Sequence, residues 1–87
     1  MYTVEYRQAV VKKLQKLDKN IAQLLIAWIG KNLMGTKNPR AQGKALSAIL
    51  AGSWRYRIGD YRIITNIDEQ TKTILILDID HRSRVYK

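Results

Sequence analysis

The spacing of hydrophobic residues changes from every second position to a helical repeat near the start of the chain. Residues 2–6 alternate between apolar and polar side chains, as a half-buried strand does. Val10, Leu14 and Leu17 then follow at i, i+4 and i+7, with Val11 beside them and lysines among the remaining positions. This change of period predicts a strand followed directly by an amphipathic helix.

A second helical pattern follows, and Asp18 or Asn20 can cap its start. Its apolar positions form a full stripe on one helix face, and they are Ile21, Leu24, Leu25, Trp28 and Ile29. Gly30 and Gly35 bracket the expected end, and residues 36–42, which include the only proline, are expected to form a loop. Because the connection between the two helical patterns is short, they are predicted to pack as an antiparallel hairpin.

The second half of the chain has the alternation of a β-sheet. After a short apolar passage, two alternating stretches flank the turn pair Gly59-Asp60, and a polar turn precedes a stretch rich in Ile and Leu. The three expected strands cover residues 54–58, 61–67 and 73–79. The predicted order is therefore β-α-α-β-β-β: an N-terminal strand, an antiparallel helical hairpin and a three-stranded antiparallel meander. This is an α+β fold with its helices on one sheet face.

Length and composition set the limits of what this fold can hold. The 87 residues are predicted to form one domain, residues 1–87, and a domain of this size buries only about 60% of its unfolded surface. The absence of cysteine excludes disulfides and Cys-based metal sites, and one histidine cannot build a His-rich site, so neither a metal nor a small-molecule cofactor is expected. The first residues lack a signal-peptide pattern and no apolar run reaches membrane-spanning length, so a cytoplasmic protein without a membrane segment is expected.

The charge of the chain is its most informative bulk property. Sixteen Lys and Arg stand against seven Asp and Glu, which leaves a formal net charge of +9. Such an excess on a small domain favours a polyanionic partner, and a nucleic-acid phosphate backbone is the simplest one. The alternative is that the basic side chains only keep the protein soluble.

Three arginines are predicted to share one face of the hairpin around Gly59-Asp60. If these two residues form the loop, Arg57 faces Arg62, and side chains alternate between the two sheet faces. Arg55, Arg57 and Arg62 then point one way. The opposite face is apolar and is expected to belong to the core, with Trp54, Tyr56, Ile58, Tyr61 and Ile63.

This concentration of like charge needs an explanation. Opposed like charges on a sheet cost up to about 1 kcal/mol per pair, and neither strand contains a carboxylate that could relieve them. Guanidinium groups bind phosphate oxygens through two-point contacts, so a phosphate site is the favoured interpretation. The alternative is a plain basic surface on which long side chains spread apart into solvent.

Two segments carry a resemblance to a known family. Residues 50–62, Leu-Ala-Gly-Ser-Trp-Arg-Tyr-Arg-Ile-Gly-Asp-Tyr-Arg, resemble the central motif of the RelE/ParE toxin superfamily. In that motif a Leu-x-Gly segment precedes an aromatic-basic-x-basic strand, a tight turn and a Tyr-Arg pair. The ending His-Arg-Ser-Arg-Val-Tyr over residues 81–86 resembles the RelE tail, and the order of strands and helices also agrees.

The resemblance implies a function and a set of site residues. RelE toxins cleave messenger RNA in the ribosomal A site without a metal and leave a 2′,3′-cyclic phosphate. Their basic and tyrosine positions match Arg55, Arg57, Tyr61 and Arg62 in the hairpin, and Arg82 and Tyr86 in the tail, with Arg84 as a competing match for Arg82. A toxin of this family normally has an antitoxin partner, and an acidic antitoxin would suit a charge of +9.

One departure from the family concerns proton transfer. The best-known RelE has lysines where this chain has Arg55 and Arg57, and arginine effectively cannot exchange a proton. Proton transfer would then fall to Tyr86 and His81, whereas the arginines stabilise charge. The alternatives are a surface histidine at a strand end and a tyrosine that is only a docked or frayed tail residue.

The remaining basic residues suggest further RNA contacts. These are Lys12 and Lys13 on the first helix, Lys44, and Arg84 and Lys87 in the tail. The helix lysines have a solvated helix face as their alternative. Asp78 and Asp80 share one strand face and are expected to pair with nearby basic groups. Two other functions stay open: a ParE-type inhibitor of DNA gyrase with the same fold, and a non-enzymatic RNA-binding module.

Overall fold

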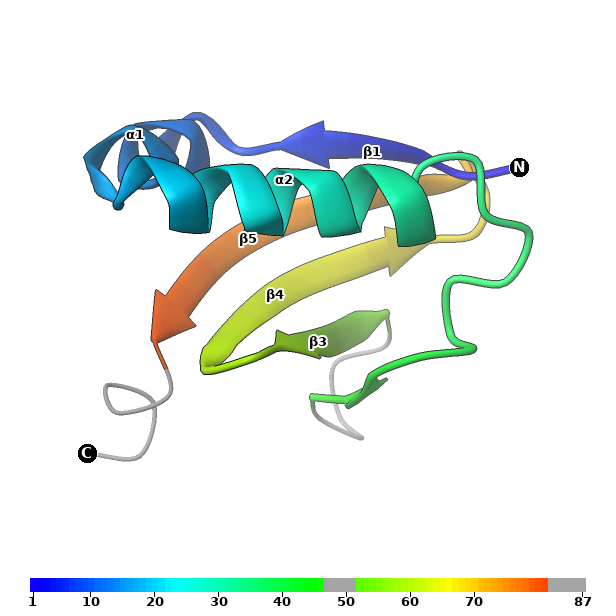
Figure 1. Ribbon diagram of the computed structural model, residues 1–87. Helices are drawn as coiled ribbons and strands as arrows, with labels where there is room; N and C mark the ends of the chain where they lie inside the picture. Colours follow the sequence, from blue (N-terminus) through cyan, green and yellow to red (C-terminus); the bar gives the residue numbers. More distant parts are fainter. Residues whose placement is uncertain (47–51, 82–87) are drawn as a thin grey trace.

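The structure is a computed structural model that describes residues 1–46 and 52–81. Two helices lie across one face of a twisted five-stranded sheet with the strand order β1-β5-β4-β3-β2 (Figure 1). The elements are β1 (Thr3–Tyr6), α1 (Gln8–Lys16), α2 (Lys19–Asn32), β2 (Lys44–Ala45), β3 (Ser53–Ile58), β4 (Tyr61–Asp68) and β5 (Thr73–His81). The α+β class and the order of the predicted elements are confirmed, and the two-residue strand β2 was not predicted.

The sheet combines a local hairpin with one long-range pairing. β3 and β4 pair antiparallel with Arg57 opposite Arg62 and Ile58 opposite Tyr61, which is the predicted register. β4 and β5 continue the meander, with an irregularity between Ile64 and Thr65. β1 pairs parallel with β5 from opposite ends of the chain.

The helices begin and pack largely as their sequences indicate. Asp18 caps α2, since its side chain accepts a hydrogen bond of 2.9 Å from the backbone N–H of Asn20. Leu25, Ile29 and Leu33 are buried at intervals of four residues, but Leu24 is 60% exposed. The predicted apolar stripe is therefore buried only in part, and Leu24 is exposed because it lies about 100° around the helix from the line that contacts the sheet.

The core lies between the helices and the sheet. It joins buried residues of every element except β2, and the largest fully buried members are Tyr56, Leu25, Ile29, Leu33, Ile63, Ile74, Ile76, Ile79 and Val10. The predicted core residues Tyr56, Ile58 and Ile63 belong to it, whereas Trp54 and Tyr61 pack against it and are partly buried. None of the helices in the described part of the chain is long and apolar enough to cross a membrane.

Candidate functional site

The arginines of the hairpin meet residues of β2 and β5 across the sheet. Lys44 lies opposite Arg55, so the two cations share one sheet face. Arg57 lies opposite Arg62, which in turn lies opposite Asp80 of β5. We call Lys44, Arg55 and Arg57 the cation side of this face, and Asp78 and Asp80 the acid side. Arg62 lies between them.

The three arginines differ in how deeply they are buried. Arg57 is exposed and Arg55 is partly buried, but Arg62 is only 7% exposed. The three arginines share one sheet face as predicted, but Arg62 is almost enclosed there, which the sequence pattern did not indicate. β4 is flanked by strands on both sides, so neighbouring side chains cover Arg62, and β5 brings Asp80 beside it.

A cleft of about 350 Å³ gathers the cations. All three hairpin arginines line it together with Lys44, and the remaining lining residues are Trp28, Gln42, Gly43 and Tyr56. The volume is within the range of small-molecule and cofactor sites, about 300–1,000 Å³. Trp28, Gln42 and Gly43 were not predicted as site residues, because α2 and the loop reach β3 only through tertiary contacts.

Two aromatic side chains fix the loop that borders the cleft. The indole Nε1 of Trp54 donates a hydrogen bond of 2.7 Å to the backbone oxygen of Gln42. The Tyr56 hydroxyl donates one of 2.5 Å to the backbone oxygen of Pro39. Burial raises the pKa of Tyr56 to about 12, against a smaller opposing effect of Arg40. The Tyr56 phenol therefore stays neutral near pH 7 and has a structural role.

Glycine is required where the loop meets β3. Gly43 has φ +80°, a conformation that L side chains rarely adopt. A Cβ at Gly43 would overlap the backbone oxygen of Arg55 and lie 2.8 Å from Nε1 of Trp54. The loop backbone therefore approaches β3 closely at the border of the cleft, and a glycine between Gln42 and Lys44 was the one sequence signal that could have indicated it.

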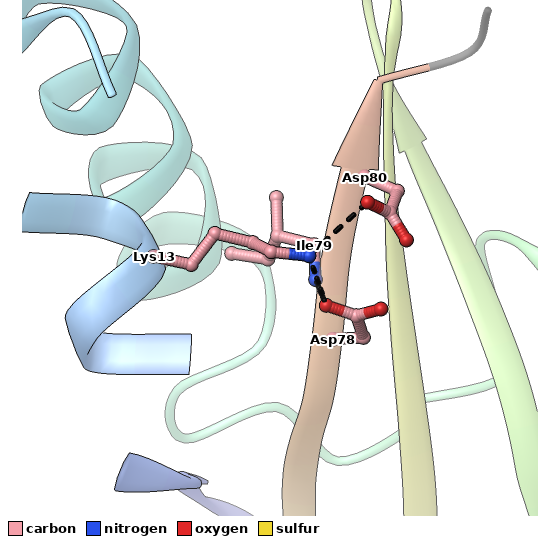
Figure 2. Close-up of polar contacts among 4 residues, drawn as sticks. All are labelled: Lys13, Asp78, Ile79 and Asp80. Atoms are coloured by element: carbon pink, nitrogen blue, oxygen red, sulfur yellow. Dashed lines mark hydrogen bonds and ion pairs between the residues drawn. The ribbon is translucent and has the colours of Figure 1, made fainter. Parts of the chain in front are cut away.

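The acid side is held by a lysine from α1. Nζ of Lys13 lies 2.8 Å from Oδ1 of Asp78 and 3.1 Å from Oδ1 of Asp80 (Figure 2). The prediction that both aspartates pair with a basic group is confirmed. The hydrogen bond to Asp78 raises the pKa of Lys13, and burial opposes this effect. Burial alone would raise the pKa of Asp78, but its contacts with Lys13, Asp80 and the N–H of Ile79 lower it below its usual value.

The other predicted site residues that the structure describes do not line the cleft. Tyr61 and His81 face each other across β4 and β5 with ring centroids 5.1 Å apart in an edge-to-face arrangement. Strand alternation puts this pair on the sheet face opposite Arg62, and neither ring lines the cleft. Lys12 is exposed on α1. The tail residues Arg82, Arg84, Tyr86 and Lys87 lie outside the described residues, so their predicted roles stay predictions.

Comparison with known proteins gives consistent similarities. Residues 4–86 match the model of the ParE toxin of the type II toxin–antitoxin system parDE. The chain is 33% identical over 86 residues to the toxin RelG of Mycobacterium tuberculosis, covering 99% of this chain and 97% of RelG. The crystal structure of the RelBE2 toxin–antitoxin complex of Mycobacterium tuberculosis contains a chain with 33% identity and a TM-score of 0.80, and 93% of this chain and 98% of that one are covered. A chain of the archaeal RelE–RelB complex from Pyrococcus horikoshii has 28% identity and a TM-score of 0.72, with 95% and 97% covered.

Proposed function

The chain belongs to the RelE/ParE superfamily of type II toxin–antitoxin toxins, and from that membership we propose that it is a ribosome-dependent endoribonuclease that cuts messenger RNA. The observation that carries the proposal is the convergence of three arginines and Lys44 on one cleft. The cations of such a site would bind the scissile phosphate and its neighbours. The similarity to proteins named RelG and RelE supports the nuclease branch of the superfamily.

The reaction we propose is attack by the ribose 2′-oxygen on the adjacent phosphorus. It requires removal of the hydroxyl proton, stabilisation of the negative charge on the phosphorane, and protonation of the departing 5′-oxygen. Arginines that are already held in place can supply the second requirement, which is often the largest contribution to catalysis. Arg62 is our first choice for this role, because it is the most firmly enclosed of the three, with support from Arg57 and Arg82.

Proton transfer needs groups other than arginine. The guanidinium stays protonated near neutral pH, so we assign proton transfer to Tyr86, because the ring of His81 lies on the sheet face opposite Arg62 and does not line the cleft. A Tyr86→Phe variant that cleaves at the rate of the parent chain in single turnover would remove the phenol from this mechanism.

The partner we propose is a cognate antitoxin. Similar chains have been solved in the RelBE2 toxin–antitoxin complex of Mycobacterium tuberculosis and in the RelE–RelB complex from Pyrococcus horikoshii. An acidic antitoxin would complement the charge of +9 and compete with RNA for the same cations. The ribosome, whose A site presents the message, is the second partner in this proposal.

A gyrase inhibitor is the second candidate, because the matching family model is that of the ParE toxin. Primer extension on a translated message, with and without ribosomes, separates the candidates. Breaks that require ribosomes support the nuclease. Intact message together with poisoned gyrase would favour the ParE-type activity, and RNA retention without either effect would favour a binding module.

A further inference from the structure

The side chain of Gln42 brings a hydrogen-bond acceptor to a cleft whose other side chains mainly donate. The cations that line the cleft carry N–H donors and no acceptor. The Tyr56 hydroxyl, which could accept a hydrogen bond, is buried and donates to the backbone oxygen of Pro39. Gln42 is exposed, and its amide offers both kinds of group, because Oε1 accepts and Nε2 donates. Among the described residues of the cleft, Gln42 therefore adds a chemistry that phosphate binding does not need.

Asn32, the last residue of α2, determines which end of the Gln42 amide stays available. Nδ2 of Asn32 donates a hydrogen bond of 2.9 Å to the backbone oxygen of Trp28. Oδ1 of Asn32 is thereby left for Gln42, whose Nε2 donates to it over 3.3 Å. A reversed Gln42 amide would place two acceptor oxygens against each other. The contact with Asn32 therefore keeps Oε1 and the second N–H of Nε2 available, and Oε1 has no hydrogen bond to any residue that the structure describes.

The backbone of Gln42 is fixed as well. Its oxygen accepts a hydrogen bond of 2.7 Å from Nε1 of Trp54. The next residue, Gly43, lies so close to β3 that a Cβ there would overlap the backbone oxygen of Arg55. Both the backbone and the side chain of Gln42 are thus held before any ligand arrives. A group held in this way loses little conformational freedom on binding, which favours affinity.

The chemistry of RNA limits what Oε1 can bind. Phosphate oxygens only accept hydrogen bonds, so the donors of a single strand are the N–H groups of its bases and the 2′-hydroxyls. A base edge places a donor next to an acceptor, and a glutamine amide matches such a pair with two hydrogen bonds, as it does with adenine. Trp28, partly buried, lines the same cleft and offers an aromatic surface on which a base can lie.

We propose that Gln42 binds the edge of one RNA base beside the phosphate that the cations bind, and that Asn32 is a positioning residue for its amide. This inference rests on RNA as the ligand of the proposed function. It adds that the cleft distinguishes a base from the bare backbone, whereas the cations alone would bind any phosphate.

The test compares two ligands of equal length and charge, oligoadenylate and an oligonucleotide whose sugars carry no bases. Gln42→Ala is expected to weaken binding of oligoadenylate by about two- to tenfold, the usual effect of one hydrogen bond. It should leave binding of the abasic ligand unchanged. The slope of log K against log salt should stay that of the parent chain, because no phosphate contact is lost. Gln23→Ala is the matched control, since Gln23 is exposed on α2 and does not line the cleft.

The role of Asn32 is tested in the same titrations. Asn32→Ala should weaken binding of oligoadenylate but not of the abasic ligand, and should add almost nothing in a Gln42→Ala background, because the two residues act as one unit. Thermal unfolding of each variant measures any loss of folded protein. A loss from Asn32→Ala that is equally large in the Gln42→Ala background would overturn the positioning role.

Three results would overturn the base contact itself. One is equal binding of oligoadenylate by Gln42→Ala and the parent chain. Another is an equal loss for both ligands, which would assign Oε1 to the sugar–phosphate backbone. The third is a parent chain that binds oligoadenylate no better than the abasic ligand, or binds neither.

Message cleavage, measured beside these titrations, separates the inference from the proposed function. If the parent chain cuts no message but prefers oligoadenylate through Gln42, the nuclease proposal fails and the base contact stands. If the parent chain cuts message on ribosomes but Gln42→Ala retains its full preference for oligoadenylate, the nuclease proposal stands and the base contact fails.

Discussion

The cation side and the acid side share one face of the sheet but balance their charges differently. Among the residues that the structure describes, the cation side has no carboxylate partner, and Nε of Arg57 donates a long hydrogen bond of 3.4 Å to the backbone oxygen of Gly59. On the acid side one lysine binds both carboxylates. The same sheet face thus contains cations without a carboxylate partner among the described residues and carboxylates that are paired with a lysine.

The two sides therefore suit different tasks: the cation side can bind a ligand, whereas the ion pairs of the acid side hold parts of the fold together. Uncompensated cations cost some stability through mutual repulsion, but their hydrogen-bond donors are free to bind an incoming phosphate. The ion pairs of the acid side connect α1 to β5, and they leave little charge for a ligand. Arg62 lies between the two sides, since it lines the cleft and also lies opposite Asp80.

Substitution of Arg62 should have the largest effect, because this residue joins the two sides. We expect Arg62→Lys, which keeps the charge and loses the planar fork, to lower message cleavage by about 10²–10³-fold, the usual loss for one transition-state donor. Primer extension under single-turnover conditions measures this loss. Cleavage within about threefold of the parent chain would remove Arg62 from the reaction, because that change is under 1 kcal/mol of barrier.

Arg62→Ala tests the burial of this residue separately. The sequence pattern puts Arg62 on the face opposite the predicted core, where substitutions usually change stability by less than about 0.5 kcal/mol. With Arg62 almost enclosed, its removal uncovers the groups that pack around it and leaves Lys13 as the cation beside Asp80, so it should destabilise the fold by about 1–3 kcal/mol. Thermal unfolding of Arg62→Ala beside Arg62→Lys shows how much of any loss of activity comes from unfolding.

The hairpin was predictable from the sequence because its geometry is local. A two-residue loop at Gly59-Asp60 fixes the register of the two strands that it joins, so the opposition of Arg57 and Arg62 followed from six adjacent positions. The acid side was not predictable in the same way, since Asp80 and Lys13 are separated by 67 positions. Their meeting depends on the packing of α1 against β5, which no local pattern specifies.

Strand β2 and the exposure of Leu24 were not predicted for the same reason, because both depend on how the elements pack. Strand β2 consists of Lys44 and Ala45 only, and two residues are too few for an alternating pattern. Leu24 has the spacing of a core residue, yet the sheet contacts a narrower strip of α2 than its apolar stripe offers. Local sequence patterns predicted the elements, whereas the borders of the cleft depend on how those elements pack.

The next largest effect should come from Gly43, which shapes the cleft without a charge. Gly43→Ala places a Cβ against the backbone of Arg55 at φ +80°, and we expect a loss of at least about 1–2 kcal/mol of stability from the left-handed backbone alone. At about 4–8 °C per kcal/mol, this loss is visible in thermal unfolding. Weaker RNA binding beyond the loss of folded protein would show that the cation side depends on the loop for its geometry.

Gly30→Ala is the matched control for this change. Gly30 lies inside α2, and a Cβ there meets nothing within 4 Å. Alanine should therefore stabilise the helix by about 0.5–1 kcal/mol. If Gly43→Ala were as stable as the parent chain, the close contact between the loop and β3 would be absent in solution.

Arg57→Ala should weaken RNA binding and slightly stabilise the protein. Removal of a phosphate contact is expected to reduce the slope of log K against log salt by about 0.7 for a single strand. Loss of the like charge opposite Arg62 should add about 0.2–1 kcal/mol of stability. RNA titrations over a series of salt concentrations, with thermal unfolding, measure both. Lys31→Ala, exposed on α2 away from the cleft, should leave the slope unchanged, and an equal change in both variants would mean that only net charge matters.

The smallest effect should distinguish Lys13 from its neighbour Lys12, both of which were expected to contact RNA. Lys13 is engaged by two carboxylates and Lys12 is exposed, so Lys13→Ala should cost about 0.2–1 kcal/mol of stability and Lys12→Ala almost none. The pKa of Asp78 is lowered in the folded state, so its contribution is complete above its unfolded value of 3.8 and is lost as the pH falls through the folded value. The difference in Tm between Lys13→Ala and the parent chain should therefore be present at neutral pH and shrink in strong acid. A difference that stays constant down to strong acid would mean that Lys13 stabilises the protein through its aliphatic chain, and the acid side would then not be held by charge.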